Sequence, residues 1–162
     1  FDHAMQSHST ETAIRLRLQQ LQTGEVELRA TTQWLTSDPS RARTIVAVWN
    51  QELQGANSED ARLVLLYLCN QMMATTRDQT AAFVVEFMGV LEEAMQCVAL
   101  ARPGIPEVAH VLQGLVQGWV KLSLFPPHFA AALTALVGRM SGGPREGYVP
   151  EAVMPGSAYT TS

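Results

Sequence analysis

The feature that most constrains this chain is helical periodicity, which runs through nearly every segment with short Gly- and Pro-containing breaks. Apolar residues recur at the spacing of one buried helix face, and neither strand-like alternation nor an Asn-Gly hairpin signal is convincing. We therefore predict an all-α domain of seven amphipathic helices with short connections, in an antiparallel, layered or superhelical arrangement.

Turn and capping residues indicate where the first helices begin and end. The first is expected to start after Ser9 or Thr10 and to end at Thr23-Gly24, because glycine accepts the left-handed conformation that closes helices. The second stops near Ser37-Asp38-Pro39, since proline cannot continue the hydrogen-bond ladder. The third follows Pro39 with Ser40 as its N-cap.

The most apolar segment, Leu63 to Cys69, identifies the central helix of the fold. Ser58-Glu59-Asp60 opens this helix with acidic residues in its first turn, as the helix dipole favours. The run is far shorter than the roughly 20 residues of a membrane-spanning helix, so we expect no membrane partner. Three further helices are predicted: one from Asp78 or Thr80 that buries Phe83, Phe87, Leu91, Met95 and Val98, one from Pro106 through Trp119, and one over 129–137.

Length and charge suit one acidic globular domain. The 162 residues carry a net charge of −4, which gives no general attraction to nucleic acid or to an anionic membrane. We divide the chain into a flexible N-terminus over 1–10, a helical domain over 11–140 and a mostly irregular tail over 141–162, where Gly, Pro, Ser and Thr dominate.

Catalytic and metal-binding patterns are not found in the sequence. The four histidines are scattered, and none lies four residues from another on a helix, as a zinc-protease pair requires. Cys69 and Cys97 lie in apolar helical patterns and are interpreted as reduced, packed thiols. Glu92 and Glu93 are adjacent on a helix and point in different directions. We expect no enzyme, no catalytic residue, no cofactor and no metal.

Three segments, in their order and spacing, resemble a known family over about residues 12 to 138. They are Arg43 to Leu53 (RTIVAVWNQEL), Leu65 to Asn70 (LLYLCN) and Gly118 to Ser123 (GWVKLS). They are similar to the CTD-interacting domain (CID), the helical module that binds the C-terminal tail of the largest subunit of RNA polymerase II. The resemblance implies a right-handed superhelical array of seven to eight helices, related to the ENTH and VHS modules.

The resemblance also implies a function and a site. It implies a nuclear, non-enzymatic adaptor that binds the polymerase tail, phosphorylated or not, and links transcription to termination or RNA processing through other proteins of those complexes. In the family, a groove between the second, fourth and seventh helices holds the extended tail. In this sequence Tyr67 and Asn70 match the groove pattern, and Gln71, Thr75, Arg77 and Lys121 are the other residues expected at the groove, the last two as phosphate contacts.

Two positions depart from the family pattern. Gln71 stands where many relatives have Asp, and Leu122 stands where they carry an Arg three residues after the Trp. Lys121 is one position earlier, and one residue turns a helical side chain by about 100°. The bidentate phosphate contact of an arginine is therefore missing at this position, and we expect weakened phosphoserine recognition.

Two alternatives to a tail-binding adaptor stay open. One is an ENTH- or VHS-like trafficking module for cargo or lipid. The low pI of about 5.5 argues against the lipid version of this alternative. The other is a scaffold whose helical surface packs inside a larger complex. The tail, which contains Tyr148, Pro150 and Tyr159, is interpreted either as a linker or as an occupant of a groove in cis or in a neighbouring molecule.

Overall fold

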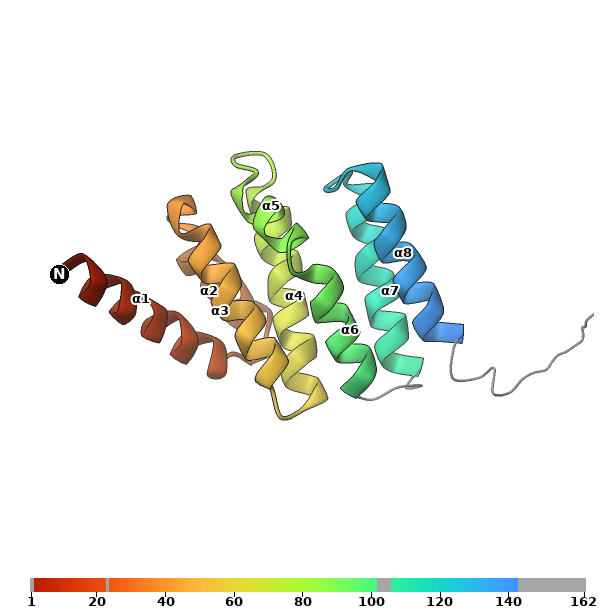
Figure 1. The fold of residues 1–162 in the computed structure, drawn as a ribbon, viewed down its shortest axis with the longest axis horizontal. Coiled ribbons are helices and arrows are strands. Elements are labelled where there is room, and N and C mark those ends of the chain that lie inside the picture. Colours follow the sequence, from red (N-terminus) through yellow and green to blue (C-terminus); the bar gives the residue numbers. More distant parts are fainter. Residues whose placement is uncertain (1, 23, 102–105, 143–162) are drawn as a thin grey trace, which may run out of the picture. The chain divides into compact units, whose positions relative to one another are not determined.

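The computed structural model describes residues 2–22, 24–101 and 106–142, and these residues form helices joined by short connections (Figure 1). No strand occurs in these ranges, so the all-α prediction is confirmed. The elements are α1 (Asp2–Gln19), α2 (Glu25–Thr36), the 3₁₀ helix η1 (Pro39–Arg41), α3 (Ala42–Gly55), α4 (Glu59–Thr76), α5 (Ala82–Met88), α6 (Leu91–Ala101), α7 (Pro106–Lys121) and α8 (Pro127–Gly142).

Two compact units divide the chain, one up to Ala94 and one from Met95, so α6 crosses the boundary. Each unit is described by itself below. None of the described helices is both long and apolar enough to cross a membrane. The division into 1–10, 11–140 and 141–162 stays a prediction, and most of its last segment lies outside the described residues.

Two predicted helix starts are wrong. The first helix begins at Asp2, earlier than the expected start after Ser9 or Thr10. Ser40 is not the N-cap before the third helix, because the Asp38 carboxylate accepts hydrogen bonds from the Ser40 amide at 3.1 Å and from its hydroxyl at 2.6 Å. Asp38 thus caps η1, with Pro39 in the first turn, and these hydrogen bonds lower the pKa of Asp38.

The prediction of a single helix from Asp78 or Thr80 is also wrong, since the structure has two helices there, α5 and α6. Gly89 N–H donates to Glu86 O at 3.1 Å and Val90 N–H to Phe87 O at 3.0 Å, a tighter 3₁₀-type pattern that ends α5. The apolar spacing continues through this break. The predicted buried positions are therefore all buried although the helix is interrupted: Phe83, Phe87, Leu91, Met95 and Val98.

The core of the first unit is built around Trp49 of α3, which is fully buried. Its indole ring meets the Phe87 ring edge to face, with the ring centroids 5.0 Å apart. The central helix α4 packs against α2, α3 and α5. Ser58 caps its start, as its hydroxyl oxygen accepts from Ala61 N–H at 3.1 Å. The prediction that α4 is central is confirmed for this unit.

In the second unit, α7 and α8 run antiparallel side by side (Figure 1). The turn between them buries Phe125, whose ring lies 5.9 Å from Trp119 and 5.0 Å from Phe129, centroid to centroid. Ser123 has a φ of 55°, and Leu124 N–H donates to Trp119 O at 3.2 Å. This is a Schellman ending of α7 with serine at the left-handed position that usually holds glycine.

Candidate peptide-binding surface on α4

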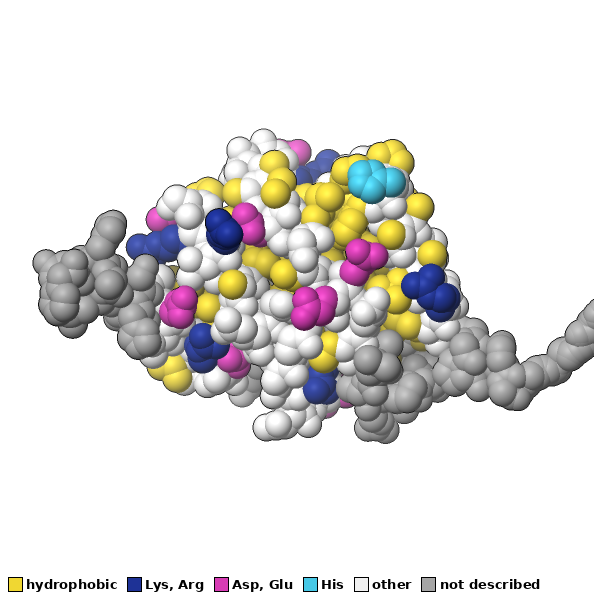
Figure 2. Space-filling model, in the orientation of Figure 1, with side chains coloured by type: hydrophobic (Ala, Val, Ile, Leu, Met, Phe, Trp, Pro, Cys, Tyr) yellow, Lys and Arg dark blue, Asp and Glu magenta, His cyan; other side chains and the backbone are white. Residues whose placement is uncertain are grey.

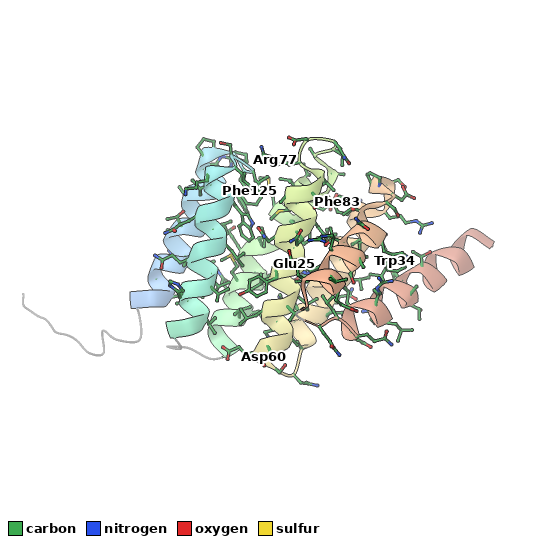
Figure 3. All side chains as sticks on the ribbon, turned by 180° about the vertical axis from the view of Figure 1, so that it is seen from behind. Glu25, Trp34, Asp60, Arg77, Phe83 and Phe125 are labelled. Carbon is green, nitrogen blue, oxygen red and sulfur yellow. The ribbon has the colours of Figure 1, made fainter. Side chains whose placement is uncertain are left out.

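Five of the six predicted site residues lie along one element. Tyr67, Asn70, Gln71 and Thr75 belong to α4, and Arg77 is the C-cap residue that follows it. Asp60 and Arg77 mark the two ends of this helix in Figure 3. Lys121 is the last residue of α7 and belongs to the second unit.

Packing leaves one face of α4 open. At about 100° per residue, Tyr67, Asn70, Gln71 and Ala74 lie within about 100° of arc, and we call them the α4 strip. Ala74 is exposed and the other three are half-buried. The remainder of the helix from residue 64 to residue 76, apart from the exposed Thr75, faces the core through Val64, Leu65, Leu66, Leu68, Cys69, Met72, Met73 and Thr76.

The chemistry of the α4 strip is polar and neutral. Between Arg62 and Arg77 the helix contains no charged residue. The carboxamides of Asn70 and Gln71 each offer donors and an acceptor, and the Tyr67 hydroxyl does both. Such groups can donate hydrogen bonds to, and accept them from, the backbone or hydroxyl groups of an extended peptide.

Arg77 places positive charge at the C-terminal end of the strip. Its Nε lies 3.5 Å from Asp78 Oδ1, and the Asp78 side chain is 86% exposed. A surface ion pair of this kind contributes about 0–1 kcal/mol. Thr75 is exposed close to Arg77 in sequence.

The end of α7 carries less positive charge than the phosphate site that the CID resemblance implies. Trp119 is buried, whereas Leu122 is 41% exposed and contributes an apolar side chain. Lys121, also exposed, is the single Lys or Arg of α7. An ammonium binds phosphate as a point charge and does not reproduce the two parallel hydrogen bonds of an arginine.

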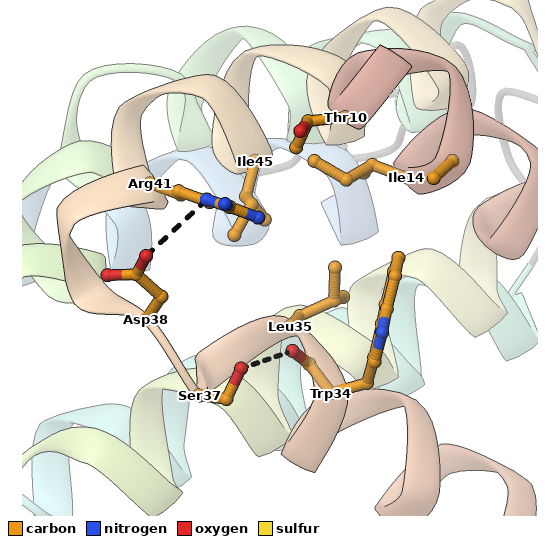
Figure 4. Close-up of a pocket in the computed structure, with 9 residues that line it drawn as sticks. Thr10, Ile14, Trp34, Leu35, Ser37, Asp38, Arg41 and Ile45 are labelled. Atoms are coloured by element: carbon orange, nitrogen blue, oxygen red, sulfur yellow. Dashed lines mark hydrogen bonds and ion pairs between the residues drawn. The ribbon is translucent and has the colours of Figure 1, made fainter. Parts of the chain in front are cut away.

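One cavity of the first unit was not predicted from the sequence (Figure 4). It measures about 140 Å³ and lies among α1, α2, η1 and α3, with the Asp38–Arg41 ion pair of 3.4 Å at one side and Trp34 at the other. The Arg17 guanidinium lies 5.1 Å from the Trp34 ring centroid. Ligand sites usually measure about 300–1,000 Å³, so we assign this cavity no ligand. The only hint in the sequence was the helical spacing of its apolar residues.

Other groups with reactive potential are dispersed or inaccessible. Within the described ranges, no three His, Cys, Asp or Glu side chains are placed to hold a metal ion. His110 and His128 are exposed. Cys69 is fully buried, and its burial raises the pKa of the thiol well above the ordinary value. Figure 2 shows acidic and basic side chains interspersed over the visible face of the first unit, without a basic patch there.

The comparisons with known proteins agree on one family. The sequence profile of the CID domain matches residues 12–133. "Regulation of nuclear pre-mRNA domain-containing protein 1B" of Homo sapiens is 28% identical over 127 residues, which are 78% of this chain and 38% of that protein. The 1A protein of Homo sapiens is 28% identical over 90 residues, 56% of this chain and 28% of that protein.

A solved structure of a CID of Ctk3 superposes with a TM-score of 0.73 at 12% identity, covering 85% of this chain and 99% of that one. At this identity the likeness shows the shared fold. The chain spans about two fifths or less of the length of the two human relatives.

Proposed function

The chain belongs to the CID domain family, and from this membership and the α4 strip we propose that it is a non-enzymatic adaptor that binds the C-terminal tail of RNA polymerase II. The strip is the observation that carries the proposal. Tyr67, Asn70 and Gln71 lie together on the open face of α4. The resemblance expects the fourth helix to line the groove, and this supports the proposal. In this function the adaptor acts in the nucleus and connects the polymerase to termination or RNA-processing proteins.

Recognition by this strip rests on hydrogen bonds more than on charge. Tyr67 packs against the peptide, and the carboxamides of Asn70 and Gln71 bind its tyrosine hydroxyl and backbone. Arg77 and Lys121 are the phosphate contacts, with Thr75 beside the first. Because Leu122 carries no charge, phosphorylation of the tail adds less affinity than an arginine there would provide. A flexible peptide also loses ordering entropy, so affinity is micromolar or weaker.

Titration of the full chain with polymerase-tail peptides, followed by amide chemical shifts in NMR, tests this function. Both unphosphorylated and serine-phosphorylated peptides are expected to shift the amides from Tyr67 to Ala74. Asn70→Ala is expected to lower the affinity at least about tenfold, because a buried hydrogen bond to the ligand is lost without replacement.

Asn50→Ala is the matched control, since Asn50 is a half-buried asparagine on α3 whose side chain accepts from Gln54. It is expected to leave the affinity unchanged. Absence of peptide-dependent shifts, together with stable co-purification of a large partner, would instead support the scaffold alternative. The CID match offers nothing in favour of the trafficking alternative, which we do not propose.

A further inference from the structure

A second, larger concavity lies wholly within the second unit, between α7 and α8. It has a volume of about 460 Å³, within the usual range of about 300–1,000 Å³ for a ligand site. Val116 and Val137 form its buried floor, and Val120 is 46% exposed. We call it the α7–α8 cleft and define it by Val116, Val120, Lys121, Thr134, Val137 and Gly138.

The cleft combines an apolar floor with a sparse polar rim. Gln113 and Gln117 lie along the α7 side, about two turns and one turn before Lys121, which supplies the one charged group among the lining residues. An occupant suited to this lining has apolar side chains for the valines, backbone groups for the two carboxamides, and one carboxylate for the ammonium.

The continuation of the chain beyond α8 begins close to this cleft. Gly142, the last residue of α8, follows Gly138 by four residues, about 6 Å of helix. The α7 side of the cleft, from Gln113 to Lys121, covers eight residues or about 12 Å. Val153 lies eleven positions after Gly142, and this length of chain can span up to about 36 Å, so a reversal and a run along the cleft are within reach.

The sequence of that continuation has the required chemistry. Between Tyr148 and Pro155 it reads YVPEAVMP, with apolar side chains around a single acidic residue, Glu151. Two prolines favour an extended backbone whose carbonyl groups remain available to side-chain donors. The acidic residue has the opposite charge to Lys121 at the rim.

We propose that the segment Tyr148–Pro155 binds in the α7–α8 cleft of its own chain, with Val149, Val153 and Met154 against the valines and Glu151 beside Lys121. The inference uses no residue of the α4 strip and shares only Lys121 with the peptide-binding proposal. The test reads the cleft through Val120, Thr134 and Gly138, so its outcome can be told apart from that of the peptide titration at Tyr67, Asn70 and Gln71.

Paramagnetic relaxation in the full chain tests the contact. A nitroxide is attached at Ser157→Cys in a Cys97→Ser background, where the remaining thiol, Cys69, is fully buried. The expected result is loss of amide intensity at Val120, Thr134 and Gly138, with the α1 amides unaffected. Val120→Asp is expected to abolish that loss, because a carboxylate is placed in the apolar cleft.

Val85→Asp on α5 is the matched control, since Val85 is an exposed valine of the first unit. It should preserve the intensity loss. The proposal is overturned if the spin-labelled protein with an unsubstituted cleft shows no loss of amide intensity. It is overturned likewise if Val85→Asp abolishes that loss as completely as Val120→Asp. A mixed sample combines spin-labelled molecules that carry no isotope with isotope-labelled molecules that carry no spin label. The proposal is also overturned if the loss of amide intensity arises only between such different molecules, because the occupant of the cleft is then a second copy.

Discussion

The indole Nε1–H of Trp49 donates a 2.7 Å hydrogen bond to the backbone carbonyl of Leu65, so α3 holds α4 through a buried polar contact. Leu65 precedes Tyr67 by two residues and therefore lies about 160° around the helix from it. The contact fixes the rotation of α4 about its own axis. As a result, the core side of α4 stays inward and the strip of Tyr67, Asn70, Gln71 and Ala74 stays open.

Replacing this indole tests its role in stability. Trp49→Phe removes the hydrogen bond and leaves a cavity, and is expected to lower the free energy of unfolding by about 2–4 kcal/mol in urea denaturation. Trp34→Phe is the control, because Trp34 is 42% exposed and its substitution should cost less than about 1 kcal/mol. Equal costs for the two variants would contradict the anchoring role of Trp49.

The neutral strip predicts how a carboxylate would act at position 71. Gln71→Asp is expected to raise the affinity for an unphosphorylated tail peptide by about fivefold, because a charge-assisted hydrogen bond to the tyrosine hydroxyl is stronger than a neutral one. Calorimetric titration measures this change. Gln96→Asp adds the same charge at an exposed site on α6 and should have no effect. Unchanged or weaker binding by the first variant would remove Gln71 from the tyrosine contact.

The end of α7 predicts a gain in phosphate recognition. Leu122→Arg is expected to strengthen binding of a serine-phosphorylated peptide by about tenfold, and to leave the unphosphorylated peptide nearly unchanged. The gain should shrink as salt is added, since exposed charges are screened. Leu16→Arg, at another exposed leucine, is the control. A similar gain from both arginines would indicate a general charge effect.

The left-handed residue at the end of α7 predicts a stabilising substitution. Ser123 has a φ of 55°, a conformation that costs an L-residue about 1–2 kcal/mol and glycine much less. Glycine loses part of this advantage through its greater freedom in the unfolded chain. Ser123→Gly is therefore expected to raise the free energy of unfolding by about 0.5–1 kcal/mol in urea denaturation, whereas Ser123→Ala should not. A destabilised glycine variant would contradict the assigned strain.

The buried thiol predicts a fall in stability at alkaline pH. Burial raises the pKa of Cys69 in the folded chain, so above the unfolded thiol pKa of about 8.5 the unfolded state loses its proton first. Stability therefore decreases as pH rises from that value, and the slope of the unfolding midpoint against pH should be shallower in Cys69→Ala. Matching slopes for the two proteins would show that the thiol does not contribute.

Some features of the fold follow from the residues alone, and others depend on competition between local signals. Ser58 was identified as the start of α4 because a capping hydroxyl precedes acidic residues and an apolar run. Asp38 was missed, because Ser40 has the same capping ability and the stronger acceptor depends on the turn geometry. The break at Gly89 was missed because Phe87 and Leu91 keep helical spacing across it.

The candidate site was predicted on a different basis. Tyr67, Asn70 and Gln71 are half-buried polar or aromatic residues at helical spacing, which fits a core boundary as well as a groove. Their order relative to Trp49 and Trp119 suggested the family, and only the packing of α4 showed which face stays open. No feature of the sequence indicated the α7–α8 cleft, because valines at helical spacing normally predict a filled core.

Each unit also contains its own optical probe. Trp49 and Trp119 are the two buried indoles, one on either side of the Ala94–Met95 boundary, while Trp34 is partly open to water. Variants that retain only one of the buried tryptophans would therefore report, through the wavelength of fluorescence emission, on the melting of one unit at a time. Coincident transitions would show that the two units unfold cooperatively.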